Sequence, residues 1–134
     1  MVNIIVMTHG EFCDGICKSV EMLVGAQENI RSLALCPGES LDNLVEHLKV
    51  TIDSFKNDFP CVVLVDLFGG SPSNAVAMLL GEGYKIYSLA GVNIPMILEV
   101  INSREECTLD DLLSQAESAG VEGITNVVTM FNEA

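Results

Sequence analysis

Basic residues are scarce in this chain. Its 134 residues include only 6 lysines and arginines against 19 aspartates and glutamates, which gives a formal net charge of −13 at pH 7. Such a charge repels phosphate backbones and anionic membrane surfaces, so it argues against nucleic acid as a partner. The acidic residues either steer the protein toward a basic partner surface or form a solvated face that keeps the protein soluble.

Long apolar runs and paired cysteines are lacking as well. The longest stretch near membrane length, Ser88 to Ile101, is broken by Gly91, Pro95 and Glu99, so we expect no membrane span. The start of the chain has neither a basic segment nor a small-residue cleavage site, so we expect no secretory signal. The 5 cysteines form no CxxC pair and are odd in number, which favours a reducing, cytoplasmic location.

What the chain does have is a regular alternation of short apolar runs and segments with helical spacing. About half of its residues (49%) are hydrophobic, enough for one domain spanning residues 1–134. The apolar runs predict buried strands at residues 1–7, 30–35, 61–65 and 85–90, and the β-branched segment Ile124–Thr129 predicts a fifth. Helices are expected to begin at Phe12, after the caps Ser40, Ser71 and Thr108, and at Pro95.

This alternation predicts an α/β fold, a doubly wound and mainly parallel sheet with helices on both faces. In the flavodoxin-like strand order 2-1-3-4, the first strand lies between the second and the third, and ligands bind at the carboxyl ends of strands one and three. His9 follows the first strand and Asp66 follows the third. The topology should therefore bring these two side chains together.

The residues around this expected meeting point suit phosphoryl transfer. A carboxylate at Asp66 can fix the tautomer of His9 and leave the other ring nitrogen as a nucleophile. The turn Gly69-Gly70-Ser71 precedes a helix, where free backbone N–H groups and the helix dipole bind anions. We therefore expect a histidine that accepts and gives up a phosphoryl group.

Two other interpretations of the same residues are weaker. His9, Asp66 and Ser71 could form a serine-hydrolase triad, but Gly-Ser-Pro lacks the Gly-x-Ser-x-Gly elbow. His9, Cys13 and Cys17 recur at intervals of four residues, yet a zinc site would need further ligands at known spacing. We expect the cysteines to be small packed thiols, and we expect neither a metal nor a cofactor.

Three stretches carry a family resemblance. Thr8-His9-Gly10, Asp66-Leu67-Phe68-Gly69-Gly70-Ser71-Pro72 and Gly91-Val92-Asn93-Ile94-Pro95-Met96 resemble the signature motifs of the mannose-family enzyme IIA (EIIA) domains of the bacterial sugar phosphotransferase system, PTS. The resemblance covers essentially the whole chain as one domain. One departure is Leu67, where some members have threonine or serine.

The resemblance implies a function and its partners. His9 would take a phosphoryl group from the phosphocarrier protein HPr on Nε2 and pass it to a histidine of enzyme IIB, which serves sugar import through the membrane subunits IIC and IID. Asp66 would orient His9 through Nδ1, and Gly69, Gly70 and Ser71 would hold the phosphate. The alternatives are a phosphocarrier serving dihydroxyacetone kinase and a non-catalytic module that senses an anion.

The resemblance also concerns assembly. Family members form a homodimer that exchanges its C-terminal strand, which here would be Ile124–Thr129, beyond the hinge-like Gly120 and Gly123. The chain ends at Ala134 without a IIB domain, so we expect a stand-alone subunit.

Overall fold

The computed structural model describes residues 1–133, and its internal contacts form two compact units, Met1–Val92 and Asn93–Ala134. The first unit carries the sheet, and the second is helical. None of the helices described in residues 1–133 has the length and apolar character needed to cross a bilayer.

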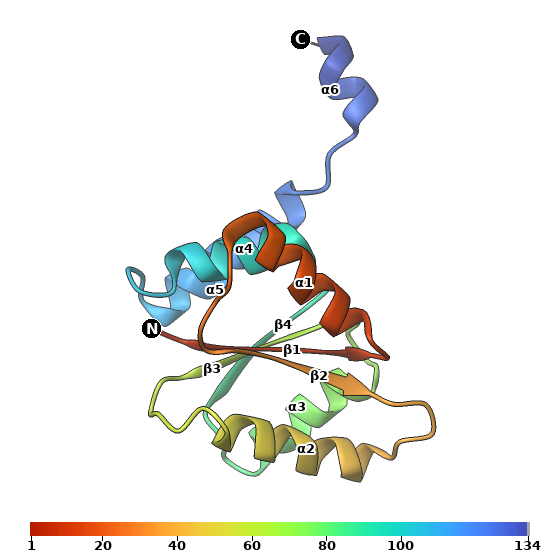
Figure 1. Cartoon of the computed structure of the whole chain (residues 1–134), viewed down its shortest axis with the longest axis vertical. Helices are drawn as coiled ribbons and strands as arrows, with labels where there is room; N and C mark the ends of the chain where they lie inside the picture. The colour runs from red at the N-terminus through yellow and green to blue at the C-terminus, as the bar shows by residue number, and fades with distance from the viewer. Residues whose placement is uncertain (134) are drawn as a thin grey trace. The chain divides into compact units, whose positions relative to one another are not determined.

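The first unit is a parallel α/β layer structure. In chain order its elements are β1 (Asn3–His9), α1 (Phe12–Val24), β2 (Ile30–Leu35), α2 (Leu41–Asp53), β3 (Cys61–Val65), α3 (Ser71–Gly81) and β4 (Ile86–Ala90). The strands pair in parallel in the order β2-β1-β3-β4. Figure 1 shows α1 on one face of this sheet and α2 and α3 on the other. The predicted strand order and two-faced cover are therefore confirmed.

Burial explains why the central strands lack a polar alternation. All five residues of β3 are buried, as are the first six of β1, because helices cover both faces of the sheet. On one face, Ile5 and Val63 pack with residues of α2 and α3 such as Leu48 and Leu79. β1 and β3 pair from Asn3 with Cys61 to Met7 with Val65, so the two strands end at the same edge of the sheet.

The structure has side-chain helix caps at two of the predicted positions, Ser40 and Thr108. The Ser40 hydroxyl accepts the Asn43 N–H at the start of α2, at 3.1 Å. The Thr108 hydroxyl accepts the Asp111 N–H at 3.3 Å, at the start of α5 in the second unit. Such caps satisfy N–H groups that have no partner within the helix.

The second unit consists of α4 (Ile94–Ser103), α5 (Leu109–Glu122) and α6 (Val127–Glu133). Asn93 ties the first two together: its Oδ1 accepts the Met96 N–H at 3.0 Å, and its Nδ2 donates to the Gly120 carbonyl at 2.9 Å. A Cβ on Gly120 would lie 3.1 Å from Met96 Cε, and one on Gly123 would lie 2.4 Å from Pro95 Cγ.

These distances correct the expectation that Gly120 and Gly123 form a hinge. Gly120 lies within α5, and Gly123 has φ −71° and ψ −10°, a conformation open to any residue. At Gly123 the ring of Pro95 approaches too closely for a side chain, and at Gly120 a side chain would require Met96 to shift by a few tenths of an ångström. The chain leaves helical geometry only after α5, in the irregular stretch of residues 124–126.

The predicted fifth strand at Ile124–Thr129 is wrong for the isolated chain, in which α6 begins at Val127. A strand needs a neighbouring edge to bond its backbone, whereas a helix satisfies its own groups. Here Asn126 starts the helix, because its Oδ1 accepts the Thr129 N–H and its carbonyl accepts the Met130 N–H, both at 3.0 Å. No residue of α6 is buried.

Candidate functional site

His9 and Asp66 meet at the carboxyl edge of the sheet, as the topology predicts. Asp66 Oδ2 lies 2.9 Å from His9 Nδ1 and also accepts the His9 backbone N–H at 3.0 Å. The His9 side chain is 47% exposed and that of Asp66 only 18% exposed. One carboxylate oxygen thus holds both the backbone and the ring of His9, while about half of the side chain remains exposed.

The charge of Asp66 sets the tautomer of His9. Burial raises the pKa of the Asp66 carboxyl, but the hydrogen bonds from the His9 backbone and ring, together with charge attraction, outweigh this effect and bring the pKa below its ordinary value. An ionised carboxylate only accepts hydrogen bonds, so Nδ1 of His9 must carry the proton. In the neutral ring, Nε2 then carries the lone pair.

The turn before α1 is held by Thr8, a residue whose part sequence reasoning missed. The Thr8 hydroxyl is fully buried, accepts the Cys13 N–H at 2.8 Å and donates to the Gly10 carbonyl at 3.3 Å. Gly10 has φ +57°, a left-handed conformation that side chains disfavour. Together these residues turn the chain sharply after His9.

The turn after Asp66 differs from the prediction in one respect. Ser71 is not the N-cap of α3: Gly70 is, with φ −83° and ψ 175°, and the cap has no side-chain hydrogen bond. The chain reverses at Gly69, where φ is +88°, so helical geometry already begins at Ser71. The hydroxyl that bonds this turn belongs to Ser73, which accepts the Gly69 N–H at 2.8 Å.

Gly70 lies directly against the His9 ring. A Cβ at this position would lie 2.7 Å from His9 Cε1, closer than real contacts allow, and 3.2 Å from Nε2. Its φ is ordinary, so the demand for glycine here comes from the close approach of the ring and not from backbone conformation.

The turn that lies against the His9 ring has free hydrogen-bond donors. Within residues 1–133, neither the N–H groups of Gly70 and Ser71 nor the Ser71 hydroxyl has a protein acceptor. They stand at the N-terminus of α3, an eleven-residue helix whose dipole favours anions there. The Gly69 N–H, by contrast, is already bonded to Ser73. The arrangement can therefore hold an anion beside the nucleophilic nitrogen of His9.

Large apolar side chains flank this site in the sequence and are open to solvent. Phe68 is 85% exposed, Leu67 60% and Phe12 51%. Leu67 has no hydroxyl that could bond the neighbouring Asp66, and Asp66 Oδ1 is buried without a hydrogen-bond partner among the described residues. Exposed aromatic residues beside a reactive group are typical of a surface that another protein covers.

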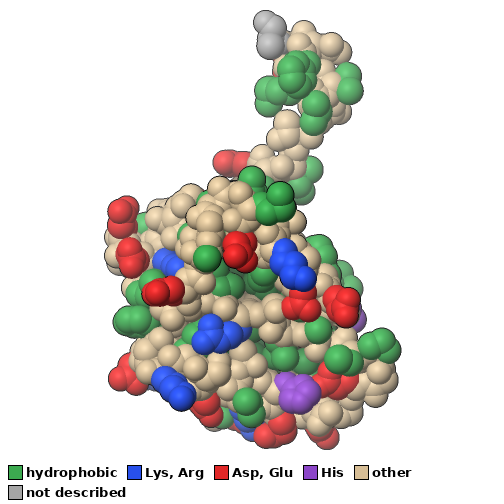
Figure 2. Space-filling view, viewed as in Figure 1, with side chains coloured by type: hydrophobic (Ala, Val, Ile, Leu, Met, Phe, Trp, Pro, Cys, Tyr) green, Lys and Arg blue, Asp and Glu red, His purple; other side chains and the backbone are tan. Residues whose placement is uncertain are grey.

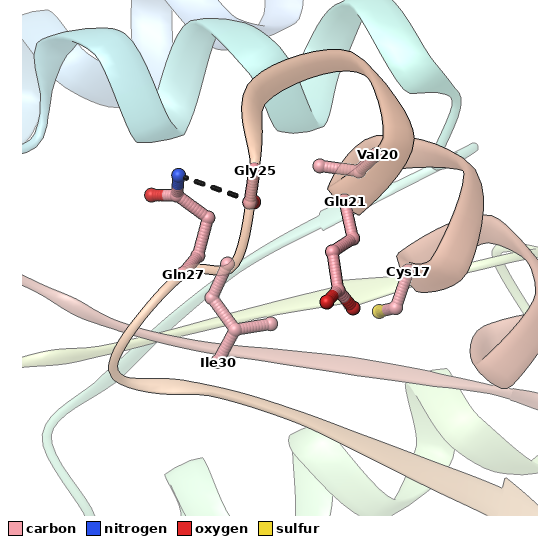
Figure 3. Close-up of a pocket in the computed structure, with 6 residues that line it drawn as sticks. All are labelled: Cys17, Val20, Glu21, Gly25, Gln27 and Ile30. Atoms are coloured by element: carbon pink, nitrogen blue, oxygen red, sulfur yellow. Dashed lines mark hydrogen bonds between the residues drawn. The ribbon is translucent and has the colours of Figure 1, made fainter.

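A separate hollow lies at the opposite edge of the sheet. It encloses about 140 Å³ between the end of α1 and the start of β2, and is lined by Cys17, Val20, Glu21, Gly25, Gln27 and Ile30 (Figure 3). Burial first, and then the charges of Cys13 and Asp14, raise the pKa of the Cys17 thiol to about 11, so the thiol stays protonated at neutral pH.

No three His, Cys, Asp or Glu side chains in residues 1–133 are grouped to hold a metal ion.

The hydrogen bonds of His9 predict how the Asp66 pKa responds to mutation. In His9→Ala the backbone N–H still binds the carboxylate, but the ring bond and ring charge are lost, so the pKa of Asp66 should rise. Since the folded-state pKa is depressed, the stability that Asp66 contributes is present above its unfolded pKa and lost as pH falls through the folded one. NMR titration of the Asp66 carboxyl carbon measures this midpoint. His47→Ala, which removes the other histidine, should leave it unchanged; an unmoved midpoint in His9→Ala would contradict the assignment.

Comparison with known proteins identifies the family. The model of the EIIA-man family, described as "PTS system fructose IIA component", matches residues 3–117. The fructose-specific EIIA component of Bacillus subtilis is 32% identical over 118 residues, covering 88% of this chain and 81% of that protein. The mannose-specific EIIAB component of Escherichia coli is 33% identical over 124 residues; the match covers 92% of this chain and 38% of that longer protein.

Solved structures agree. The phosphotransferase system component EIIA of Streptococcus agalactiae has a TM-score of 0.87 and 34% identity, over 96% of this chain and 99% of that one. The mannose/sorbose specific IIA subunit of Enterococcus faecalis has a TM-score of 0.84 and 25% identity, over 94% of each chain. The predicted family resemblance is therefore confirmed, and the chain belongs to the mannose family of EIIA components of the sugar phosphotransferase system.

Proposed function

We propose that this chain is a phosphohistidine carrier: His9 accepts a phosphoryl group from phospho-HPr and passes it to a histidine of enzyme IIB. The observation that carries the proposal is the contact of Nδ1 with Asp66, which leaves the Nε2 lone pair available on a half-exposed ring, next to the turn that contains the free donors of Gly70 and Ser71. We place this relay in the cytoplasm, ahead of the membrane subunits IIC and IID. Residues 1–134 would act as a single domain, since the family match runs through both compact units.

The transfer conserves atoms and electrons. The Nε2 lone pair of His9 forms a bond to phosphorus, and the phosphorus–nitrogen bond of the donor histidine breaks, with its electron pair returning to the donor ring. The Nδ1 proton stays between the ring and Asp66, whose carboxylate stabilises the positive charge that develops on the phosphorylated ring. Gly70 and Ser71 would hold the phosphoryl oxygens. The same steps in reverse deliver the group to enzyme IIB.

Phosphorylation of His9 is the direct test. Phosphoenolpyruvate, enzyme I and HPr should label the wild type with acid-labile phosphate at Nε2 of His9, and His9→Ala should stay folded and unlabelled. Asp66→Asn should keep the fold but slow transfer on the order of 100-fold or more, because the amide no longer fixes the tautomer. Quenched-flow labelling and mass spectrometry measure both effects.

Two results would refute the carrier function. If an active donor system leaves the wild type unlabelled, a module that only senses an anion is favoured. If His9→Ala is labelled normally, another residue carries the phosphate.

We also propose that the exposed apolar residues near His9 dock the partner proteins. Phe12 begins the outward face of α1, which continues through the exposed Gly15 and Ser19 to Leu23, and Phe68 stands in the turn after Asp66. None of these five residues carries charge, although the exposed Glu11, Lys18 and Glu21 lie beside them in the sequence. Exposed aromatic residues near the reactive group suit a transient protein contact.

Phe68→Ala tests the docking surface. Loss of this side chain should raise the KM for phospho-HPr roughly ten-fold with little change in kcat, because it removes contact area without touching the His9–Asp66 pair. Phe59→Ala is the matched control, since Phe59 is 44% exposed and precedes β3 at the opposite edge of the sheet. Equal KM values for the two variants would rule Phe68 out as a docking residue.

We further propose a homodimer in which residues 124–129 of one copy extend the sheet of the other. β4 pairs only with β3 among the described residues, so its outer edge is open. Apolar side chains gather on the C-terminal segment (Figure 2), where Ile124 is 80% exposed and Phe131 78% exposed. An open edge and an unburied β-branched segment are complementary, and adding a strand would satisfy both.

Truncation separates this exchange from other contacts. A chain ending at Gly123 should be monomeric in analytical ultracentrifugation and keep the circular dichroism of its sheet. A chain ending at Met130, which retains residues 124–129, should remain a dimer. The exchange is refuted if the shorter chain also dimerises or if the full chain is monomeric at micromolar concentration.

A further inference from the structure

Ser73 forms hydrogen bonds within the turn between Asp66 and α3, although its hydroxyl bonds neither His9 nor Asp66. It is the third residue of α3, counted after the N-cap Gly70. Its hydroxyl accepts the Gly69 N–H at 2.8 Å and donates to the Gly70 carbonyl at 3.1 Å. A side chain at this position that reaches back to a backbone N–H before the helix resembles one half of a capping box.

The two hydrogen bonds of Ser73 hold the Gly69 N–H and the Gly70 carbonyl, the backbone groups on either side of the peptide bond between these glycines. Gly69 has φ +88°, a region in which glycine is otherwise free to move. The Gly70 carbonyl is held a second time, by the Asn74 N–H at 3.0 Å. With both ends bonded, the Cα of Gly70 is kept against Cε1 and Nε2 of His9, and the N–H groups of Gly70 and Ser71 stay directed away from the protein's own acceptors.

The hydroxyls of Ser71 and Ser73 therefore differ in their hydrogen bonding. Within residues 1–133 the Ser71 hydroxyl has no partner and is available to a ligand, whereas the Ser73 hydroxyl is already used as donor and acceptor. A hydroxyl that is fully occupied in this way contributes geometry and not a ligand contact.

We infer that Ser73 is a positioning residue of this site: it orders the Gly69–Gly70 turn so that the Gly70 and Ser71 donors and the His9 ring are prealigned for the phosphoryl group. The inference rests on the proposed function for its consequence, but its geometric part can be measured without phosphate. Prealigned donors need no reorganisation when the group arrives, so their loss lowers the rate of transfer more than the affinity for the donor protein.

The test compares Ser73→Ala with Ser73→Thr, which keeps the hydroxyl, and with Ser54→Ala as the matched control. Ser54 likewise donates its hydroxyl to a backbone carbonyl, that of Thr51, but at the end of α2. With phospho-HPr as donor, Ser73→Ala should lower kcat roughly ten-fold and leave KM within about two-fold. Ser73→Thr should recover most of the rate, and Ser54→Ala should match the wild type.

NMR of the unphosphorylated protein supplies the independent measurement. The His9 Cε1–H resonance, whose carbon faces Gly70, should shift in Ser73→Ala and stay in place in Ser54→Ala. Ser73→Cys, which keeps the shape but bonds weakly, guards against a folding defect and should shift the resonance in the same direction. A resonance that stays in place in both Ser73→Ala and Ser73→Cys overturns the inference. Failure of wild-type labelling would overturn only the carrier function.

Discussion

The contact between His9 and Asp66 depends on one constraint, the parallel register of β1 and β3. Met7 pairs with Val65, so the last residues of β1, Thr8 and His9, and the residue after β3, Asp66, lie at the same edge of the sheet. Side chains alternate between the faces of a sheet, and a slip by one residue would send Asp66 to the other face and exchange the layers against which the residues of β3 pack. The core that makes slippage costly, with Ile5 and Val63 packed under α2 and α3, therefore also fixes the geometry of the site.

Two hydroxyl groups extend this order from the strands to the turns. Thr8 bonds the turn that leads into α1, and Ser73 bonds the turn that leads into α3, so the chain is fixed on both sides of the His9 ring. Both hydroxyls act on backbone groups within five residues of themselves. Local bonds of this kind hold a turn in place even where its own residues, such as Gly10 and Gly69, have a wide range of conformations.

The sequence could predict the parts of the site that depend on topology. Valine-rich runs without alternation indicate central strands, and the rules for parallel sheets then bring His9 to Asp66. It could not show that Gly70 and not Ser71 caps α3, because the helix start depends on the backbone angle of Gly69. Nor could the β-branched residues at 124–129 decide their own structure: a strand requires a second edge, and in the single chain Asn126 starts a helix instead.

The donors at the site also fit what a carrier requires. Among residues 1–133, no lysine or arginine is bonded to His9, Asp66 or the turn between Gly69 and Ser71. Backbone N–H groups at a helix start would hold a phosphoryl group through partial charges, whereas a cationic side chain would bind the phosphorylated state more tightly and slow its release. In the proposed relay, a His9 ring that is 47% exposed would leave the phosphoryl group open to water until a partner covers it. Weak anion binding would let the group leave, and the exposed apolar residues near His9 would favour transfer to a protein.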